Sequence, residues 1–133
     1  MASDTNISAS GVAPKVTVSG GNLIRYHCQF FLEKPEGETW PGTDSPLKMI
    51  HEVVFNQDHA PTDTFSLGEA AELETLSLNW VIDMKIPGGT GSLQYFADVK
   101  VEQGGNAVMN WSDTGKLDNT KAIGDFSIFN VTP

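Results

Sequence analysis

Two short stretches of the sequence set a tryptophan beside side chains that form hydrogen bonds. Trp40 precedes Thr43 and Asp44, and residues 110–113 read Asn-Trp-Ser-Asp. An indole ring offers a flat apolar face to the C–H bonds of a sugar, while amide, hydroxyl and carboxyl groups bind its hydroxyls. The candidate ligand-binding residues are Trp40, Asp44, Asn110, Trp111 and Asp113. The expected ligand is a glycan.

Each tryptophan also has a structural interpretation. Trp40 lies in residues 34–46, where three prolines and two glycines predict a long loop. A tryptophan in such a loop is either a lid packed over the core or an exposed platform for a ligand. Trp111 shares one face of the expected strand 107–112 with Ala107 and Met109, so a core position fits the pattern as well as a sugar-binding one.

Metal-binding patterns are incomplete. His51-Glu52 begins the His-Glu-x-x-His pattern of zinc proteases, but Phe55 occupies the position of the second histidine. Four acidic residues in expected loops are the type that binds calcium, although their spacing fits no EF-hand, and solvated loop acids are the preferred interpretation. These four are Asp58, Asp63, Asp113 and Asp118. We expect no metal site.

Catalytic and cofactor motifs are missing as well. Residues 88–91 are glycine-rich, but no Gly-Lys-Ser/Thr sequence follows, so they predict a turn rather than a phosphate-binding loop. Cys28 is the single cysteine and falls on the apolar side of its expected strand with Tyr26 and Phe30, which predicts a buried, unreactive thiol. We therefore predict that the protein is not an enzyme and uses no cofactor.

The chain is acidic, with a formal net charge of −9. No Lys or Arg lies between Lys48 and Lys85, whereas seven acidic residues do. Such a surface repels phosphate backbones, so we expect no nucleic-acid partner. The N-terminal residues lack the basic and apolar segments of a signal peptide, and no apolar run approaches the length of a membrane span. The location is unknown, with the cytoplasm as the default.

The element that must position these residues is the stretch 74–86. Every even position from 76 to 86 is apolar, whereas Val81 is the only apolar residue at the odd positions from 75 to 85. This period of two predicts a strand with one buried and one solvated face, as in antiparallel sheets. A second layer must cover the apolar face.

Alternation and turn residues place the other strands. They are expected at 15–19, 23–33, 47–56, 64–67, 93–102, 107–112 and 121–131. Strands 74–86 and 93–102 are expected to form a hairpin, and Phe126 and Ile128 to pack in the core. At most one short helix is expected, near 67–74, where Ser66 to Glu69 resembles a capping box. A short helix is the alternative for 47–56.

The fold class predicted from this pattern is all-β: an antiparallel two-sheet sandwich, jelly-roll-like, or a small barrel of seven or eight strands. Residues 1–14 are expected to be a flexible N-terminal arm and residues 15–133 a single domain.

Three functions remain open. The first is a non-enzymatic binding module, lectin-like in its ligand. The alternative is a self-assembling structural domain that forms oligomers or particles through exposed edge strands and the N-terminal arm. A further alternative is a β-sandwich toxin acting at membranes, which the acidic charge and the lack of a basic amphipathic stretch disfavour. The expected partners are a glycan and further copies of the chain.

Overall fold

The computed structural model describes residues 2–21, 23–56, 61–88 and 91–133, and in these residues it has nine strands and one short 3-10 helix. The elements are β1 (Thr5–Ser8), β2 (Lys15–Gly20), β3 (Arg25–Glu33), β4 (Leu47–Phe55), β5 (Thr62–Ser66), η1 (Ala70–Leu73), β6 (Ser77–Lys85), β7 (Ser92–Gln103), β8 (Asn106–Asp118) and β9 (Thr120–Thr132). None of the described residues forms a helix of the length and apolarity that crossing a membrane requires.

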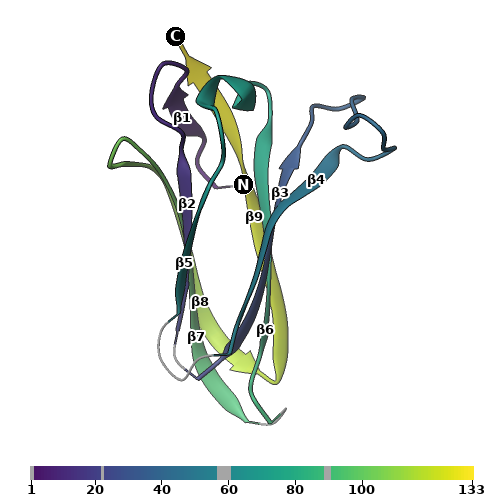
Figure 1. Ribbon diagram of the computed structural model, residues 1–133. Helices are drawn as coiled ribbons and strands as arrows, with labels where there is room; N and C mark the ends of the chain where they lie inside the picture. The colour runs from purple at the N-terminus through teal and green to yellow at the C-terminus, as the bar shows by residue number, and fades with distance from the viewer. Residues whose placement is uncertain (1, 22, 57–60, 89–90) are drawn as a thin grey trace.

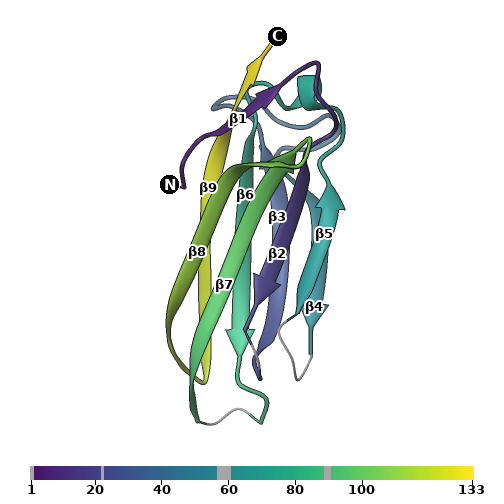
Figure 2. The ribbon, with the colours of Figure 1, turned by 90° about the vertical axis from the view of Figure 1, so that its left-hand side faces the viewer.

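Two sheets pack face to face, as the two views in Figures 1 and 2 show. Sheet A has the strand order β1-β9-β6-β3-β4, and sheet B has the order β5-β2-β7-β8. They do not close into a barrel, so the predicted sandwich is confirmed and the barrel alternative is not. Pairing is antiparallel except between β1 and β9, which run parallel.

The strand expected at 74–86 lies in the middle of sheet A. β6 pairs with β3 on one side and β9 on the other. Its even-numbered side chains are buried and Trp80 is only 1% exposed. Each large apolar side chain buried in this way contributes roughly 1.5–3 kcal/mol, which makes the inner face of β6 a principal source of stability.

The expected hairpin between 74–86 and 93–102 is wrong, because β6 lies in sheet A and β7 in sheet B. Gly88 and Gly91 have φ of 92° and 111°, which lets the connection leave one sheet for the other. β7 instead forms a hairpin with β8 through Gly104 and Gly105, at the turn expected there.

Part of the segment expected to be a flexible arm is a strand. Thr5 in β1 is fully buried and its hydroxyl lies 2.6 Å from that of Ser127 on β9. Ile7, two residues on, is also buried. The inward-facing Thr5 and Ile7 thus hold β1 at the edge of sheet A. Two alternating positions are too few to stand out in the sequence.

The last two strands are longer than expected, and the side chains of β9 that face the core are not the expected ones. β8 continues to Asp118, through residues expected to form a loop. Phe126 and Ile128 lie on the outer face of sheet A, 39% and 40% exposed, while Phe129 is buried. The prediction that Phe126 and Ile128 pack in the core is therefore wrong.

The expected short helix is a four-residue 3-10 turn, η1, without a side-chain cap. The predicted capping box does not form, because the Ser66 hydroxyl accepts a hydrogen bond from the Gly68 N–H at 3.2 Å instead. This segment carries the chain from β5 in sheet B to β6 in sheet A, over one end of the sandwich (Figure 1).

Candidate ligand-binding groove

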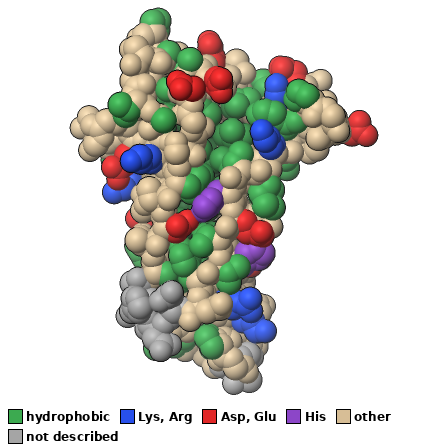
Figure 3. Space-filling model, in the orientation of Figure 1, with side chains coloured by type: hydrophobic (Ala, Val, Ile, Leu, Met, Phe, Trp, Pro, Cys, Tyr) green, Lys and Arg blue, Asp and Glu red, His purple; other side chains and the backbone are tan. Residues whose placement is uncertain are grey.

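A groove opens at this end of the sandwich, between the loop that joins β3 to β4 and the segment around η1. Its volume is about 350 Å³. We call it the Trp40 groove; it is lined by Leu32, Lys34, Glu38, Trp40, Lys48, Ile50, Leu67, Glu72, Leu73, Glu74, Thr75 and Leu76. Figure 3 shows hydrophobic side chains gathered near the top of this face, with acidic and basic side chains around them.

Trp40 is held in one orientation. Its Nε1–H donates to the carbonyl oxygens of Leu32 at 3.2 Å and Pro46 at 2.8 Å. The backbone of the loop is closed around it, since the Trp40 N–H donates to the Ser45 carbonyl at 3.0 Å. The indole is half-buried against the core, so it is a lid with part of its surface in the groove.

A β-bulge in β4 turns another apolar side chain toward the groove. Phe30 pairs with His51 and Phe31 with Met49, which leaves Ile50 as the extra residue. Ile50 is half-buried and packs against the core, whereas Met49 is 45% exposed on the outer face. The interpretation of 47–56 as a strand is confirmed. The pattern predicts Met49 on the same face as His51 and Val53, but the bulge puts it on the opposite face.

The rim of the groove carries both signs of charge. The ammonium groups of Lys34 and Lys48 lie 4.8 and 5.1 Å from the centroid of the Trp40 ring. Glu72 and Glu74, near η1, are exposed. In the described residues none of these four groups forms an ion pair, so their hydrogen-bonding capacity is available to a ligand.

The other candidate residues lie elsewhere. Asp44 is exposed in the same loop as Trp40 but does not line the groove. Asn110, Trp111 and Asp113 lie on β8, at the edge of sheet B. Asn110 is exposed on the outer face, while Trp111 and Asp113 are half-buried on the inner face. The residues around Trp40 and the residues around Trp111 therefore do not form one site. Asn110 also lies on the opposite face of β8 from Trp111 and Asp113.

Trp111 and Asp113 make contacts within the sandwich. The Trp111 ring meets Trp80 edge to face, with centroids 5.4 Å apart. Asp113 accepts a hydrogen bond at 3.2 Å from the hydroxyl of Tyr95, which is 2% exposed. The Trp111–Trp80 contact joins the two sheets, whereas the Asp113–Tyr95 hydrogen bond lies within sheet B, between β7 and β8.

Reactive and metal-binding groups are engaged or dispersed. In the described ranges, no three His, Cys, Asp or Glu side chains lie close enough to hold a metal ion. Asp58 lies outside those ranges, and Asp63 bonds to His51. Burial, then the charges of Asp63 and Asp83, raise the pKa of Cys28 to about 12, which keeps it a neutral thiol.

No protein-family model matches the chain, and neither a curated protein sequence nor a solved structure matches it. The groove is therefore interpreted from its own residues. Sequence reasoning named Trp40 but missed Lys34, Lys48 and Ile50, because their approach depends on the path of the loop and on the bulge, which alternation alone does not reveal.

Proposed function

We propose that the protein is a non-enzymatic binding module that holds a carbohydrate in the Trp40 groove. The observation that carries the proposal is the half-exposed Trp40 ring, fixed by two hydrogen bonds of its indole N–H. A preordered aromatic surface loses little conformational entropy when a ligand packs on it. Aliphatic side chains of Leu67, Leu73 and Leu76 extend the apolar wall.

The polar rim supplies partners for sugar hydroxyls. The carboxylates of Glu72 and Glu74 accept hydrogen bonds, and the ammonium groups of Lys34 and Lys48 donate them. Binding sites of this kind combine an apolar lining with a few polar groups that fix orientation. Because both lysines lie beside the ring, we expect glycans carrying a carboxylate or sulfate group to bind more tightly than neutral ones.

Binding without catalysis is the better proposal for these carboxylates. A carboxyl group that acts as a general acid near neutral pH is usually held in an apolar environment, which keeps it protonated. Glu38, Glu72 and Glu74 are all exposed to solvent. They are placed to contact a ligand rather than to exchange protons with it.

The test is a glycan array of neutral and acidic glycans, followed by calorimetry on any ligand found. We expect Trp40→Ala to weaken binding at least about tenfold, the scale of an aromatic contact residue. The combined Lys34→Ala and Lys48→Ala variant should weaken acidic glycans more than neutral ones. Phe96→Ala is the matched control, since Phe96 is also a half-exposed aromatic but lies on the outer face of sheet B.

The two sets of candidate residues give opposite outcomes in this experiment. Binding that is lost in Asn110→Ala or Trp111→Phe but intact in Trp40→Ala would move the ligand to β8 and contradict the groove. An array with no ligand at all would count against carbohydrate recognition.

A second candidate function, a self-associating structural domain, is favoured by a different observation. Apolar side chains are exposed on the outer face of sheet A, among them Met49, Phe126 and Ile128. Exposed apolar groups of this kind mark interaction surfaces. Sedimentation velocity over a range of concentrations tests this candidate, and a monomer at every concentration would exclude it.

A further inference from the structure

The outer faces of the two sheets differ in polarity. On sheet B, hydroxyl groups of neighbouring strands bond across the face, Thr17 to Thr64 at 3.0 Å and Ser19 to Thr62 at 2.7 Å. A face of this composition is normal for the solvated side of a sandwich. On the outer face of sheet A, polar side chains also bond across strands, Gln29 to Glu52 and Asn79 to Glu33, but exposed apolar side chains lie among them.

Sheet A carries a group of apolar side chains there, which we call the apolar patch. It consists of Phe31, Leu47, Met49, Val81, Phe126 and Ile128. The register sets Met49 opposite Phe31, and Phe126 opposite Asn79 on the strand next to Phe31, so the patch spans β4, β3, β6 and β9. Asn79 and Ser77 of β6 lie among these side chains, and a group of exposed apolar side chains on four strands is suited to docking against another surface.

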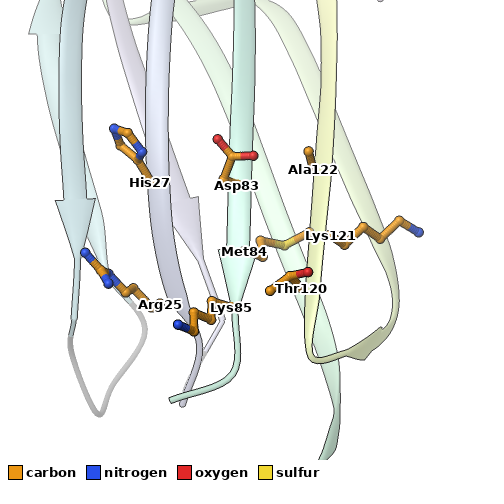
Figure 4. A pocket seen from close by; sticks show the side chains of 8 residues that line it. All are labelled: Arg25, His27, Asp83, Met84, Lys85, Thr120, Lys121 and Ala122. Carbon is orange, nitrogen blue, oxygen red and sulfur yellow. The ribbon is translucent and has the colours of Figure 1, made fainter. Parts of the chain in front are cut away.

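Positive charge lies at one end of this face. Arg25 on β3 is directly opposite Lys85 on β6, and His27 and Asp83 form the next opposed pair on this face (Figure 4). Like charges in direct opposition destabilise a sheet, and neither cation forms an ion pair with a described residue. Lys121 extends away from them in Figure 4, and its ammonium lies 5.2 Å from the Tyr95 ring centroid.

Negative charge lies at the other end. Glu33 ends β3, and the loop that follows carries Glu36 and Glu38. These three residues line a hollow of about 700 Å³ that Phe126 and Ile128 of the apolar patch also line. The apolar patch therefore has Arg25 and Lys85 at one end of the face and Glu33, Glu36 and Glu38 at the other, with Asp83 and Glu52 between the two cations and the patch.

We propose that two copies of the chain pair through the outer faces of sheet A, with their strands antiparallel. In that arrangement, Arg25 and Lys85 of each copy lie against Glu36 and Glu38 of the other, with the apolar patches in contact between them. This inference rests on the self-association candidate and adds its interface and orientation.

The order of the charges along this face supports the antiparallel orientation. Arg25 precedes Phe31 by six residues on β3 and Glu33 follows it by two, with Glu36 and Glu38 in the loop beyond the end of the strand. A two-fold axis near the row of Phe31 and Phe126 therefore sets each cationic end against an acidic end, and the two-fold symmetry doubles every such contact. A parallel arrangement would put cations against cations and acids against acids, which costs free energy.

The experiment is sedimentation velocity on the full chain over a range of concentrations. We expect a dimer that Phe126→Asp weakens about tenfold or more, since a charge would then be buried at the centre of the interface. Phe96→Asp is the control, because Phe96 is 41% exposed and Phe126 is 39% exposed, but on opposite faces of the molecule. Circular dichroism checks that both variants keep the fold.

Charge exchange tests the orientation. Arg25→Glu with Lys85→Glu should weaken the dimer, as should Glu36→Lys with Glu38→Lys, and combining all four changes should restore it. A dimer that withstands Phe126→Asp, or that the four changes fail to restore, overturns this inference while self-association stands. A strict monomer overturns both.

Discussion

The Nε2–H of His51 on β4 donates a hydrogen bond to Oδ2 of Asp63 on β5, at 2.6 Å. β4 is an edge strand of sheet A and β5 an edge strand of sheet B, so this contact joins the two sheets along one open side of the sandwich. The His51 ring also stacks on Phe65, with centroids 4.1 Å apart. A histidine that looked like the start of a zinc motif thus has a structural role.

Removing this contact should destabilise the protein. We expect His51→Ala to lower the free energy of unfolding by about 1–2 kcal/mol, because a hydrogen bond to a charged group and a ring contact are both lost. Urea denaturation measures the change. His27→Ala is the control, since His27 bonds Glu52 at the same 2.6 Å but in a more exposed pair within sheet A, and the expected loss is clearly smaller because solvent screens the pair. Equal losses in the two variants would contradict the role given to His51.

Cys28 should resist thiol reagents in the folded protein. Burial is the main cause that raises the pKa of its thiol to about 12, so at pH 8 almost none is thiolate. A disulfide reagent should label it only after unfolding in urea. Rapid labelling of the native protein at pH 8 would show that the thiol is neither buried nor neutral.

The same shift predicts a loss of stability at high pH. The pKa of the thiol in the folded protein lies above its ordinary value of 9.0, so only the unfolded chain ionises its thiol between pH 9 and about 12. The full stability is present below pH 9 and falls by up to about 1.4 kcal/mol per pH unit above it. Cys28→Ala should flatten the decline measured by urea unfolding at pH 9–10; an unchanged decline would assign it to other groups. Tyr26, whose pKa is also raised by burial, adds to the loss above pH 10.

Alternation predicted the middle of the sandwich better than its margins. The inner faces of β3 and β6 followed from the sequence because nine-residue strands give several repeats of the period. β1, with four residues, gives only two inward positions. In β9, the outer face is as apolar as the inner one, so alternation alone does not show that Phe126 and Ile128 face away from the core.

The candidate site was predictable only in part. Trp40 stood out because an aromatic residue in a loop rich in proline and glycine needs a reason to be there. Asn110 and Trp111 are adjacent in the sequence, but adjacent residues of a strand face opposite ways, so the second cluster divided. The lysines beside Trp40 depend on tertiary contacts that a single sequence does not specify.

Gly124 should not tolerate a side chain. A methyl group added there would overlap the backbone carbonyl oxygen of Trp80, which the sheet holds in place. Gly124→Ala should therefore cost about 2–3 kcal/mol through forced separation of β6 and β9. Gly21→Ala is the control, because a methyl group there meets ordinary contacts at 3.4 Å and beyond. Thermal unfolding of both variants measures the difference, and similar melting temperatures would contradict the packing described for β9.

Asp113 should act on stability through Tyr95 rather than on ligand binding. In Asp113→Ala the buried hydroxyl of Tyr95 loses the acceptor that lies 3.2 Å away, and an unpaired buried hydroxyl costs about 1–3 kcal/mol. Tyr95→Phe removes the donor together with its need for a partner, so it should cost less. If the hydrogen bond is the cause, adding Asp113→Ala to Tyr95→Phe should have little further effect, and urea denaturation of the three variants gives the coupling. Additive losses would show that Asp113 stabilises the fold in some other way, and a glycan affinity lowered in Asp113→Ala but not in Tyr95→Phe would return Asp113 to the ligand-binding residues.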